Sequence, residues 1–408
     1  MNLFAVAGDP ILDSKSPDIW NNVFYELGID AHYFRIQTGS AKEAVKLIKD
    51  IGVSGCNITS PLKEKILEFI DIADSDVKKV LAANLIIYKD GKLYGHNTDV
   101  YGVTQALLKN GFDPKGKKAV VLGTGGAARA VVYALLKAGA VEVTVAGRTL
   151  KKAEKIAKDF GCNSCDIKKA GNIVKGSNIL ISCVPVAERI VKAESLHKDL
   201  TVLDANYSVI TTLQKDAANI GCTLINGTEW LLYQAEASFK KFYELEPVEY
   251  MELAMDIPNK KKKSYALIGF MGVGKTSYGK KLAKQLGIDF VDLDAEIEKM
   301  SNMTVVEIFN GKGEEYFRRL EKETLFSINF NEPKVLSCGG GTVLDEDNVK
   351  FLKQHTNIIW LWNDIKIIRS RVNDTTRPLF NNDAEQLLKT RIPIYAKACD
   401  VCITSTVP

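Results

Sequence analysis

The stretch Gly269-Phe-Met-Gly-Val-Gly-Lys-Thr276 matches the pattern G-x-x-x-x-G-K-[ST] at every required position. An apolar run, residues 265–269, precedes it and predicts a strand, and an amphipathic segment, residues 277–286, comes after it and predicts a helix. In such a unit the glycines let backbone N–H groups turn toward phosphate oxygens, while Lys275 reaches the terminal phosphates and the Thr276 hydroxyl can bind Mg²⁺. A glycine-rich turn without a ligand would require the Lys-Thr pair to be accidental.

This loop also divides the chain. The segment C-terminal to it is about as long as one small domain, and the segment N-terminal to it is far too long to be a tail. The 408 residues are 46% hydrophobic and 25% charged, which is typical of a globular protein with two or three domains. We therefore expect separate N-terminal and C-terminal units.

Charge and hydropathy restrict the partners. The chain has 54 basic and 50 acidic residues, and this near balance argues against nucleic acid as the main partner. The one basic run, residues 260–263, is interpreted as part of a solvated linker, with a targeting or membrane patch as the alternative. We expect a cytoplasmic protein without a membrane partner, because no apolar run is long enough to cross a bilayer and the first residues lack signal-peptide features.

Cysteine spacing gives little support to a metal site. Two C-x-x-C pairs occur, Cys162/Cys165 and Cys399/Cys402, but the distance between the pairs does not match a zinc ribbon and no His lies near either. We expect reduced, mostly buried thiols.

Short β-like runs alternate with amphipathic segments over the first hundred residues, which predicts a mainly parallel sheet with crossover helices. The expected strands are 3–7, 33–36 and 52–58, and the expected helices are 18–27 and 41–50. Polar clusters stand between these elements and are expected at the carboxyl ends of strands, where open α/β sheets bind ligands. They comprise Ser14 and Ser16, which could bind a small anion together, Asn57, Thr59 and Lys63, then Asn84, and finally Asn97–Asp99 after a hairpin around residues 89–92.

A glycine-rich turn marks the start of a second lobe. The predicted strand 118–122 is followed by Gly123, Gly125 and Gly126 and by a helix through Lys137. A second strand, 141–146, follows at the spacing of a dinucleotide-binding fold and leads to Arg148 in place of an acidic residue. An arginine suits a 2′-phosphate, so NADP is preferred over NAD. For the rest of this lobe we expect two further strands, 178–183 and 200–205, and a closing helix, 230–245. A linker is expected after residue 246.

Together these residues resemble shikimate dehydrogenase over nearly all of residues 1–245. The resemblance depends on S-x-S-P at Ser14–Pro17, N-x-T-x-P-x-K at Asn57–Lys63, N-T-D at Asn97–Asp99, the glycine loop, Arg148-Thr149, Asp204-Ala-Asn-Tyr207 and Gln234. It implies that Lys63 and Asp99 form an acid/base pair beside the nicotinamide. It implies substrate binding by Ser14, Ser16, Asn57, Thr59, Asn84, Asp99, Tyr207 and Gln234, and NADP binding by Gly123, Gly125, Gly126, Ala127, Arg148, Thr149 and Gly227.

Four departures from the family pattern put coenzyme preference and turnover in question. Asp13 stands where a His is common, Leu85 where a Thr is common, Gly147 where an Asn precedes the Arg, and Ser182-Cys-Val-Pro185 replaces Asn-Ala-Thr-Ser. The first two concern substrate binding and the last two concern the coenzyme.

The C-terminal unit carries a second set of polar motifs. Asp292-Leu-Asp294 follows a predicted strand, 288–291. One of the two carboxylates could lie in a magnesium shell and the other could bind a substrate hydroxyl. Alternatively, Asp294 could cap a helix that starts near residue 295. Gly313 is expected to open a long helix that includes Arg318, and Gly339–Gly341 follow a predicted strand, 334–337. A polar loop, residues 374–380, contains Arg377, and Arg391 lies on the next predicted helix.

This set resembles shikimate kinase over residues 264–408. The resemblance implies that Asp294, Arg318 and Arg391 hold shikimate with the glycine triplet Gly339, Gly340 and Gly341, that Arg377 belongs to a lid over ATP, and that Asp292 lies in the magnesium shell. Catalytic roles are expected for Lys275, Arg377 and Asp294, ATP binding for Gly272, Val273, Gly274, Lys275, Thr276, Ser277 and Arg377, and Mg²⁺ binding for Thr276 and Asp292.

The predicted fold class is α/β, with a two-lobed N-terminal dehydrogenase and a C-terminal P-loop kinase with a parallel sheet. The expected divisions are a substrate lobe at 1–103, a Rossmann NADP lobe at 104–246, a linker at 247–263 and the kinase at 264–408.

The resemblances together imply a bifunctional enzyme with NADP(H), ATP and Mg²⁺ as cofactors. It would reduce 3-dehydroshikimate and phosphorylate the shikimate formed, as a monomer or a homodimer. The alternatives are a catalytically silent shikimate- or quinate-sensing protein, and a quinate/shikimate dehydrogenase that uses NAD and is fused to the kinase.

Overall fold

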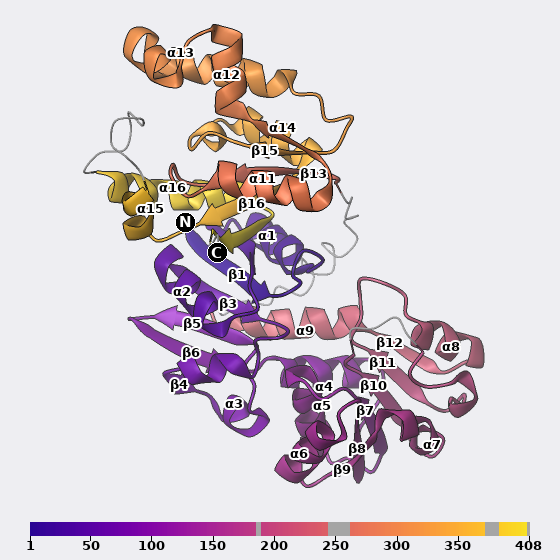
Figure 1. Cartoon of the computed structure of the whole chain (residues 1–408). Helices are drawn as coiled ribbons and strands as arrows, with labels where there is room; N and C mark the ends of the chain where they lie inside the picture. Colours follow the sequence, from indigo (N-terminus) through magenta and orange to yellow (C-terminus); the bar gives the residue numbers. More distant parts are fainter. Residues whose placement is uncertain (185–188, 244–261, 372–382, 406–408) are drawn as a thin grey trace.

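The structure is a computed structural model of the whole chain, and it describes residues 1–184, 189–243, 262–371 and 383–405. The strands form an eleven-stranded sheet and a six-stranded sheet (Figure 1). This arrangement confirms the predicted α/β class with parallel sheets. In the described ranges, no helix is long and apolar enough to cross a membrane.

The six-stranded sheet is the predicted Rossmann lobe. All neighbouring strands in it are parallel, in the order β12-β11-β10-β7-β8-β9, which places the first strand of the lobe at the centre beside the topological switch point. The strands are β7 (Lys118–Leu122), β8 (Glu142–Gly147), β9 (Asn163–Asp166), β10 (Ile179–Ser182), β11 (Thr201–Asp204) and β12 (Thr223–Asn226). The helices are α5 (Gly126–Lys137), α6 (Leu150–Phe160), α7 (Ala170–Val174) and α8 (Thr212–Ile220).

The N-terminal lobe contributes six strands to the larger sheet. They are β1 (Asn2–Gly8), β2 (Ala31–Gln37), β3 (Val53–Ile58), β4 (Ile72–Ala73), β5 (Leu85–Lys89) and β6 (Lys92–His96), with helices α1 (Ser16–Glu26), α2 (Ala41–Ile51) and α3 (Ser75–Val80). The expectation that every polar cluster follows a strand is wrong for Asn84. This residue precedes β5, which is antiparallel to β3, so that Asn84 reaches the edge at which β3 ends.

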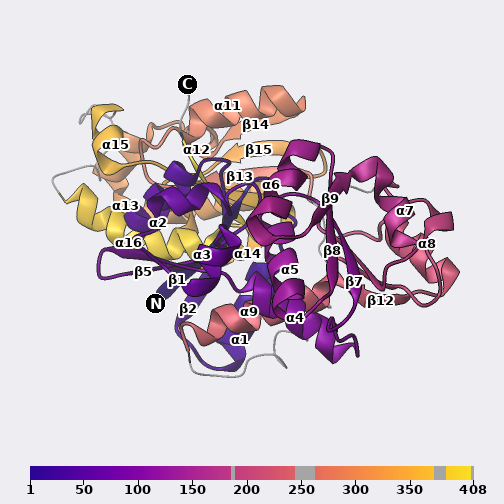
Figure 2. The ribbon, with the colours of Figure 1, turned by 90° about the horizontal axis from the view of Figure 1, so that it is seen from below.

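Two helices connect the lobes. Helices α4 (Asp99–Lys109) and α9 (Gly227–Lys240) pack side by side, and a Cβ atom built on Gly102 would lie 2.8 Å from both the Gln234 Cβ and the Trp230 Cδ1. A glycine at this position therefore lets the helix backbones approach closely. Helix α9 begins three residues before its predicted start, and it lies near α1 (Figure 2). The ring centroids of Phe239 on α9 and Trp20 on α1 are 5.4 Å apart.

The C-terminal unit adds five parallel strands. They are β13 (Ser264–Ile268), β14 (Asp289–Asp292), β15 (Lys334–Ser337), β16 (Thr356–Trp362) and β17 (Val401–Thr404), with helices α11 (Lys275–Leu286), α12 (Leu293–Ser301), α13 (Val305–Ser327), α14 (Glu346–His355), α15 (Ile365–Arg371) and α16 (Ala384–Ala398). The expectation that a long helix opens at Gly313 is only half right. Two helical segments run together as α13, and Gly313, with φ of 86°, forms the kink between them.

The two units share one sheet, which the sequence did not indicate. Strand β17 of the C-terminal unit pairs in parallel with β2 of the N-terminal lobe, with Cys402 opposite Ile36. The ring centroids of Phe34 and Trp360 lie 5.9 Å apart across this junction, and both side chains are buried. The sheet and the apolar core therefore continue from one unit into the other.

The junction also contains a titratable group, His32 of β2. Desolvation, followed by the positive charges of Lys353 and Lys397, lowers its pKa from 6.5 to about 4. Because the folded-state pKa lies below the unfolded-state value, the unfolded chain binds more protons between these limits, and stability is lost as the pH falls from about 6.5 to about 4.

We expect this residue to account for part of the loss of melting temperature between pH 7 and pH 5. The shift corresponds to at most about 3 kcal/mol. The His32→Gln variant cannot be protonated, so its melting temperature should fall less over this range in parallel thermal scans. An equal fall in both proteins would contradict the prediction.

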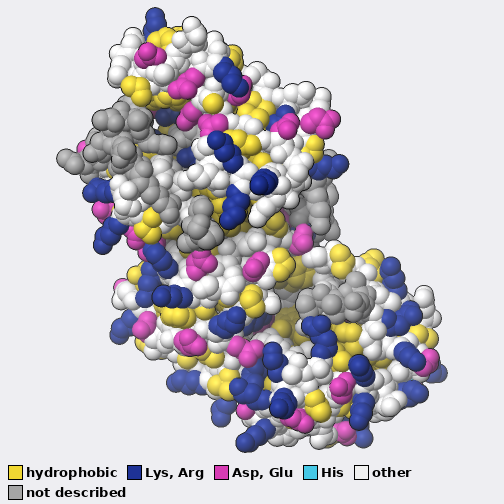
Figure 3. Space-filling model, in the orientation of Figure 1, with side chains coloured by type: hydrophobic (Ala, Val, Ile, Leu, Met, Phe, Trp, Pro, Cys, Tyr) yellow, Lys and Arg dark blue, Asp and Glu magenta, His cyan; other side chains and the backbone are white. Residues whose placement is uncertain are grey.

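The eight cysteines are free thiols. Five are buried and three are half-buried, and no group of three or more metal-ligating side chains gathers in the part of the chain that the structure describes. On the face shown in Figure 3, basic and acidic side chains are interspersed.

Candidate active sites

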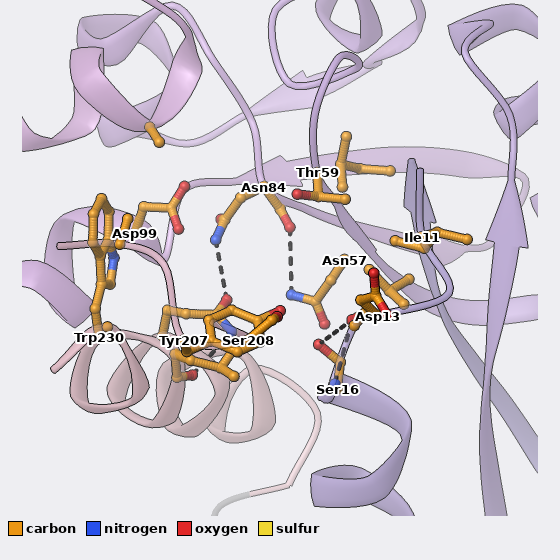
Figure 4. A pocket seen from close by; sticks show the side chains of 18 of the residues that line it. Ile11, Asp13, Ser16, Asn57, Thr59, Asn84, Asp99, Tyr207, Ser208 and Trp230 are labelled. Atoms are coloured by element: carbon orange, nitrogen blue, oxygen red, sulfur yellow. Dashed lines mark hydrogen bonds between the residues drawn. The ribbon is translucent and has the colours of Figure 1, made fainter. Parts of the chain in front are cut away.

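A cavity of about 370 Å³ opens between the substrate lobe and the Rossmann lobe. The loop after β1, the end of β3, the start of α4, the loop after β11 and helix α9 all supply side chains to it (Figure 4). The structure brings together here the predicted catalytic residue Lys63 and the predicted substrate residues, which are Ser14, Ser16, Asn57, Thr59, Asn84, Asp99, Tyr207 and Gln234.

Lys63 and Asp99 form an ion pair in this cavity, with the Lys63 ammonium donating to the Asp99 carboxylate. The two side chains are only 16% and 6% exposed. Asp99 is the first residue of α4, where the positive end of the helix stabilises a carboxylate. Solvent screens this ion pair less than it screens a surface salt bridge. The Lys63 ammonium is therefore a charged hydrogen-bond donor inside the cavity.

The two serines lie at the start of α1. The Ser14 hydroxyl donates to the Ser16 hydroxyl at 3.3 Å, and the Ser16 N–H donates to the Ser14 hydroxyl at 3.3 Å. Both hydroxyls therefore stand beside a helix N-terminus, an arrangement that favours an anion. Tyr207, from the other lobe, forms hydrogen bonds with the Ser14 side chain and the Lys15 backbone, while desolvation raises its pKa.

Three positions that the sequence analysis missed orient the amides of this site. Tyr33 donates from its hydroxyl to the Asn57 side-chain oxygen at 2.8 Å, and the Asn57 amide donates to Ser238 at 3.1 Å. The Asn84 amide donates to the Thr98 hydroxyl at 2.9 Å. Tyr33 and Ser238 lie within a strand and a helix, so no motif marks them, whereas Thr98 was visible only as the middle residue of N-T-D.

The glycine loop of the Rossmann lobe directly adjoins the ion pair. A Cβ atom on Gly126 would lie 2.7 Å from the Lys63 Cβ, so the close approach of the two lobes requires a glycine here. Gly123 has φ of 116°, a conformation that L side chains rarely adopt. A Cβ on Gly125 would meet nothing within 4 Å, which leaves open space at the N-terminus of α5.

The other predicted coenzyme residues flank this loop. Arg148 is exposed directly after β8, and Thr149 precedes α6. Gly227 lines the cavity with Ala127, and a Cβ on Gly227 would lie 2.5 Å from the Asp204 carbonyl oxygen. The residues present therefore fit a dinucleotide, with backbone N–H groups for a pyrophosphate and an available guanidinium for a 2′-phosphate.

The structure shows the surroundings of the residues that depart from the family pattern. Asp13 lines the cavity, and Leu85 is fully buried in β5. A Cβ on Gly147 would lie 2.5 Å from the Thr124 Cγ2, so Gly147 accommodates the glycine loop. Burial raises the pKa of the Cys183 thiol, which therefore stays protonated near the Lys63 and Asp99 charges. Residues 185–188 lie outside the described residues.

The P-loop has the conformation that its sequence predicts. Gly269, Gly272 and Gly274 have φ of 137°, 76° and 101°, all in the region that favours glycine. The buried Lys275 ammonium donates to the carbonyls of Gly269 at 2.9 Å and Phe270 at 3.1 Å, and so lies across the loop. Val273 is buried, whereas Ser277 is exposed at the start of α11.

Thr276 and Asp292 meet beside the P-loop. The Thr276 hydroxyl donates to the Asp292 carboxylate at 2.7 Å. A hydroxyl and a carboxylate oxygen on neighbouring elements fit Mg²⁺, which prefers oxygen ligands and keeps several of its waters. The structure thus brings together the two residues predicted for the metal.

A second cavity, of about 460 Å³, opens beyond the P-loop. The predicted kinase substrate residues line it, namely Asp294, Arg318, Gly339, Gly340, Gly341 and Arg391. Asp294 lies in the first turn of α12. Arg377 lies outside the described residues.

Arginines lie against two members of the glycine triplet, Gly340 and Gly341. A Cβ on Gly341 would lie 2.4 Å from the Arg318 Nη2, and the Arg391 Nη1 donates to the Gly340 carbonyl at 3.2 Å. Glu321, which the sequence analysis missed, pairs with Arg318 at 2.7 Å. Desolvation lowers the pKa of Arg318, but Glu321 and Glu314 outweigh this effect and raise it, so the guanidinium stays charged.

Known protein families match the parts of the chain that form both cavities. Family models match residues 6–86 (shikimate dehydrogenase substrate binding domain), 106–209 (shikimate / quinate 5-dehydrogenase) and 271–407 (shikimate kinase). The shikimate dehydrogenase (NADP(+)) of Methanococcoides burtonii is 37% identical over 254 residues, which are 60% of this chain and 93% of that protein. The corresponding enzyme of Methanopyrus kandleri is 34% identical over 274 residues, or 62% of this chain and 94% of that protein.

Solved structures show the same likeness. Shikimate 5-dehydrogenase from Thermus thermophilus, in complex with NADP(H) and shikimate, has 30% identity and a TM-score of 0.57, and the match covers 62% of this chain and 98% of that one. Quinate dehydrogenase from Corynebacterium glutamicum, in complex with NAD, has 26% identity and a TM-score of 0.57, with the same coverage. The chain therefore belongs to the shikimate dehydrogenase family and, because a shikimate kinase domain follows on the same polypeptide, is a bifunctional shikimate-pathway enzyme that uses NADP(H) and ATP.

Proposed function

We propose that the first cavity reduces 3-dehydroshikimate to shikimate and that the second phosphorylates shikimate at its 3-hydroxyl. The observation that carries the first assignment is the shielded Lys63–Asp99 pair, which lies in a cavity lined by both lobes and contacts the glycine loop. We further propose the divisions 1–103, 104–246, 247–263 and 264–408 for the substrate lobe, the NADP lobe, the linker and the kinase.

The Lys63–Asp99 pair supplies the proton chemistry of the reduction. When bound, NADPH supplies a hydride for the carbonyl carbon. The carbonyl oxygen then develops negative charge, which the Lys63 ammonium stabilises before it gives up a proton to form the alcohol. Asp99 holds the Lys63 side chain in place, and after the transfer the Lys63 amine regains a proton from solvent.

The remaining groups of the first cavity orient the substrate. Ser14 and Ser16 bind its carboxylate at the start of α1, and Thr59, Asn57, Asn84 and Gln234 bind its ring hydroxyls. Tyr207 closes the cavity from the other lobe, and Arg148 selects the 2′-phosphate of NADP. The hydrogen bonds of Tyr33 and Ser238 fix the amide directions before substrate arrives.

A serine substitution tests this assignment. We expect Ser14→Ala to raise the dehydrogenase KM for shikimate by about 10- to 100-fold, because the carboxylate loses a charge-assisted hydrogen bond. The KM for NADP⁺ and both kinase constants should stay within about twofold. Steady-state kinetics of shikimate oxidation and of shikimate phosphorylation measure all four constants, and an unchanged KM for shikimate in the oxidation would remove Ser14 from the site.

In the kinase, positioning and charge neutralisation accomplish the transfer. Lys275 and the P-loop N–H groups hold the β- and γ-phosphates, and Thr276 and Asp292 hold Mg²⁺, which neutralises phosphate charge. Arg318 and Arg391 bind the shikimate carboxylate, while Asp294 binds and orients the attacking hydroxyl. We propose that Arg377 closes over ATP as part of a lid.

Quinate with NAD is a second candidate for the first cavity. The structural likeness to a quinate dehydrogenase in complex with NAD favours it, and the departure at Asp13, which lines the cavity, bears on the choice of substrate. Rates measured with NAD and NADP on shikimate and on quinate decide between the two. The proposed function predicts the highest kcat/KM with shikimate and NADP, because Arg148 can bind the 2′-phosphate.

The partners are therefore small molecules, and the family matches identify an enzyme and not a silent sensor. We propose a cytoplasmic protein, a monomer or a homodimer, that binds neither nucleic acid nor membrane. The near balance of charge supports this proposal.

A further inference from the structure

One guanidinium connects the two enzymes. Arg35 projects from β2 and donates to the Ser14 carbonyl from both Nε, at 3.2 Å, and Nη2, at 2.7 Å. Its Nη1 donates to the carbonyl of Asp400, immediately before β17 of the kinase, at 3.3 Å. The side chain is 11% exposed, so these bonds are largely shielded from water.

The carbonyl oxygen that accepts hydrogen bonds from Arg35 belongs to Ser14, a residue of the proposed carboxylate site. Ser14 lies in the loop between β1 and α1, outside any strand ladder, and its N–H donates to the Ile11 carbonyl at 3.0 Å. Two N–H donors on the Ser14 carbonyl fix the orientation of this peptide and therefore the position of the Ser14 backbone from which the hydroxyl projects. The ion pair of Arg35 with Asp18 is longer, at 3.9 Å, and contributes less to this orientation.

The kinase side of the bridge is itself fixed. The Asp400 carboxylate accepts a hydrogen bond from the Ile358 N–H at 2.7 Å, and the Asp400 N–H donates to the Ile358 carbonyl at 2.8 Å. These two bonds join Asp400 to β16, the strand beside the P-loop strand β13. The carbonyl that Arg35 contacts therefore has a position determined by the kinase sheet.

Further contacts hold the two units together on either side of this bridge. The Thr404 hydroxyl donates to the Glu43 carboxylate of α2, and Lys46 of the same helix pairs with Asp364 at 3.3 Å. With the β2–β17 pairing, these contacts join the N-terminal lobe and the kinase unit at several points besides Arg35.

We propose that Arg35 is a positioning residue through which the kinase domain sets the place of Ser14, and hence the affinity of the dehydrogenase for the carboxylate of its substrate. This inference depends on the proposed role of Ser14. It assigns to the kinase domain a second task, as part of the scaffold of the neighbouring active site.

Substitution of Arg35 in the full-length protein tests the bridge. We expect Arg35→Met to raise the dehydrogenase KM for shikimate about tenfold, with kcat, the KM for NADP⁺ and both kinase constants within about twofold. Arg35→Lys keeps one charged donor and should recover part of the affinity. Arg189→Met is the matched control, since Arg189 pairs with Asp216 in the Rossmann lobe, and it should leave the KM for shikimate unchanged.

Asp400→Ala tests the kinase side, because it removes the carboxylate that accepts a hydrogen bond from the Ile358 N–H and substitutes no residue of the dehydrogenase. We expect a rise in the dehydrogenase KM for shikimate of about threefold, with kinase constants unchanged. If Arg35→Met has the expected effect and Asp400→Ala has none, the role of the kinase domain is refuted. If Ser14→Ala raises the KM and Arg35→Met does not, the bridge is refuted while the proposed function stands. If Ser14→Ala itself has no effect, the proposed site fails.

Discussion

Replacing Lys63 by alanine is expected to lower kcat for NADPH-dependent reduction by about 10²–10⁴-fold, because the developing alkoxide loses both its proton donor and its nearest positive charge. The Lys63 ammonium contacts Asp99 in a cavity that excludes much of the solvent, so water cannot readily substitute for it. Phosphorylation of shikimate should remain near normal, since Lys63 lies in the other cavity.

The measurement is NADPH consumption at saturating 3-dehydroshikimate, followed by the kinase assay on the same preparation. Lys65→Ala is a matched control, because Lys65 is an exposed lysine two residues away, and it should retain both activities. Loss of both activities in Lys63→Ala would overturn the assignment of two independent sites, and retention of reduction would remove Lys63 from the chemistry.

Replacing Lys275 by methionine is expected to impair the kinase and to spare the dehydrogenase, the reverse of the effect expected for Lys63→Ala. Phosphoryl transfer should fall by about 10²–10⁴-fold, because the γ-phosphate loses the charge that neutralises it during transfer. The same ammonium now binds the Gly269 and Phe270 carbonyls, so its loss should also loosen the P-loop and raise the KM for ATP. Reduction of 3-dehydroshikimate should be unaffected.

The measurement is ADP formation in the presence of shikimate, ATP and Mg²⁺. Lys284→Met serves as the control, since Lys284 is exposed near the other end of the same helix, α11, and this variant should behave as wild type. Wild-type phosphorylation by Lys275→Met would exclude the P-loop from the kinase reaction.

The sequence predicted best where the determinants of structure are local. The P-loop could be read in full because its glycines, its lysine and its threonine occupy eight consecutive residues between a strand and a helix. The Lys63–Asp99 pair needed the family resemblance as well, since 36 residues separate its members and spacing alone does not place them together.

Long-range relations could not be predicted in the same way. Nothing in residues 31–37 or 401–404 indicates that β2 and β17 pair, because neither segment carries a local pattern that identifies a partner strand in the other unit. Arg35 looked like a polar residue within a strand for the same reason. The kink at Gly313 was misread as a helix start, because a glycine inside a helix and a glycine before one give the same local pattern.

The sequence alone does not distinguish this chain from two separate proteins joined by a linker. In the structure, the continuous sheet and the Arg35 hydrogen bonds join the dehydrogenase and kinase units into one framework. We propose that both cavities bind the same hydroxylated cyclohexene acid, so that the product of the first is the substrate of the second.

One coupled assay tests that claim most directly. The purified full-length protein is supplied with 3-dehydroshikimate, NADPH, ATP and Mg²⁺, and the products are followed by absorbance of NADPH and by mass spectrometry. The account predicts oxidation of NADPH together with the appearance of shikimate 3-phosphate, with both stopping when 3-dehydroshikimate is left out. NADPH that stays reduced and ATP that stays intact in the complete mixture would contradict it.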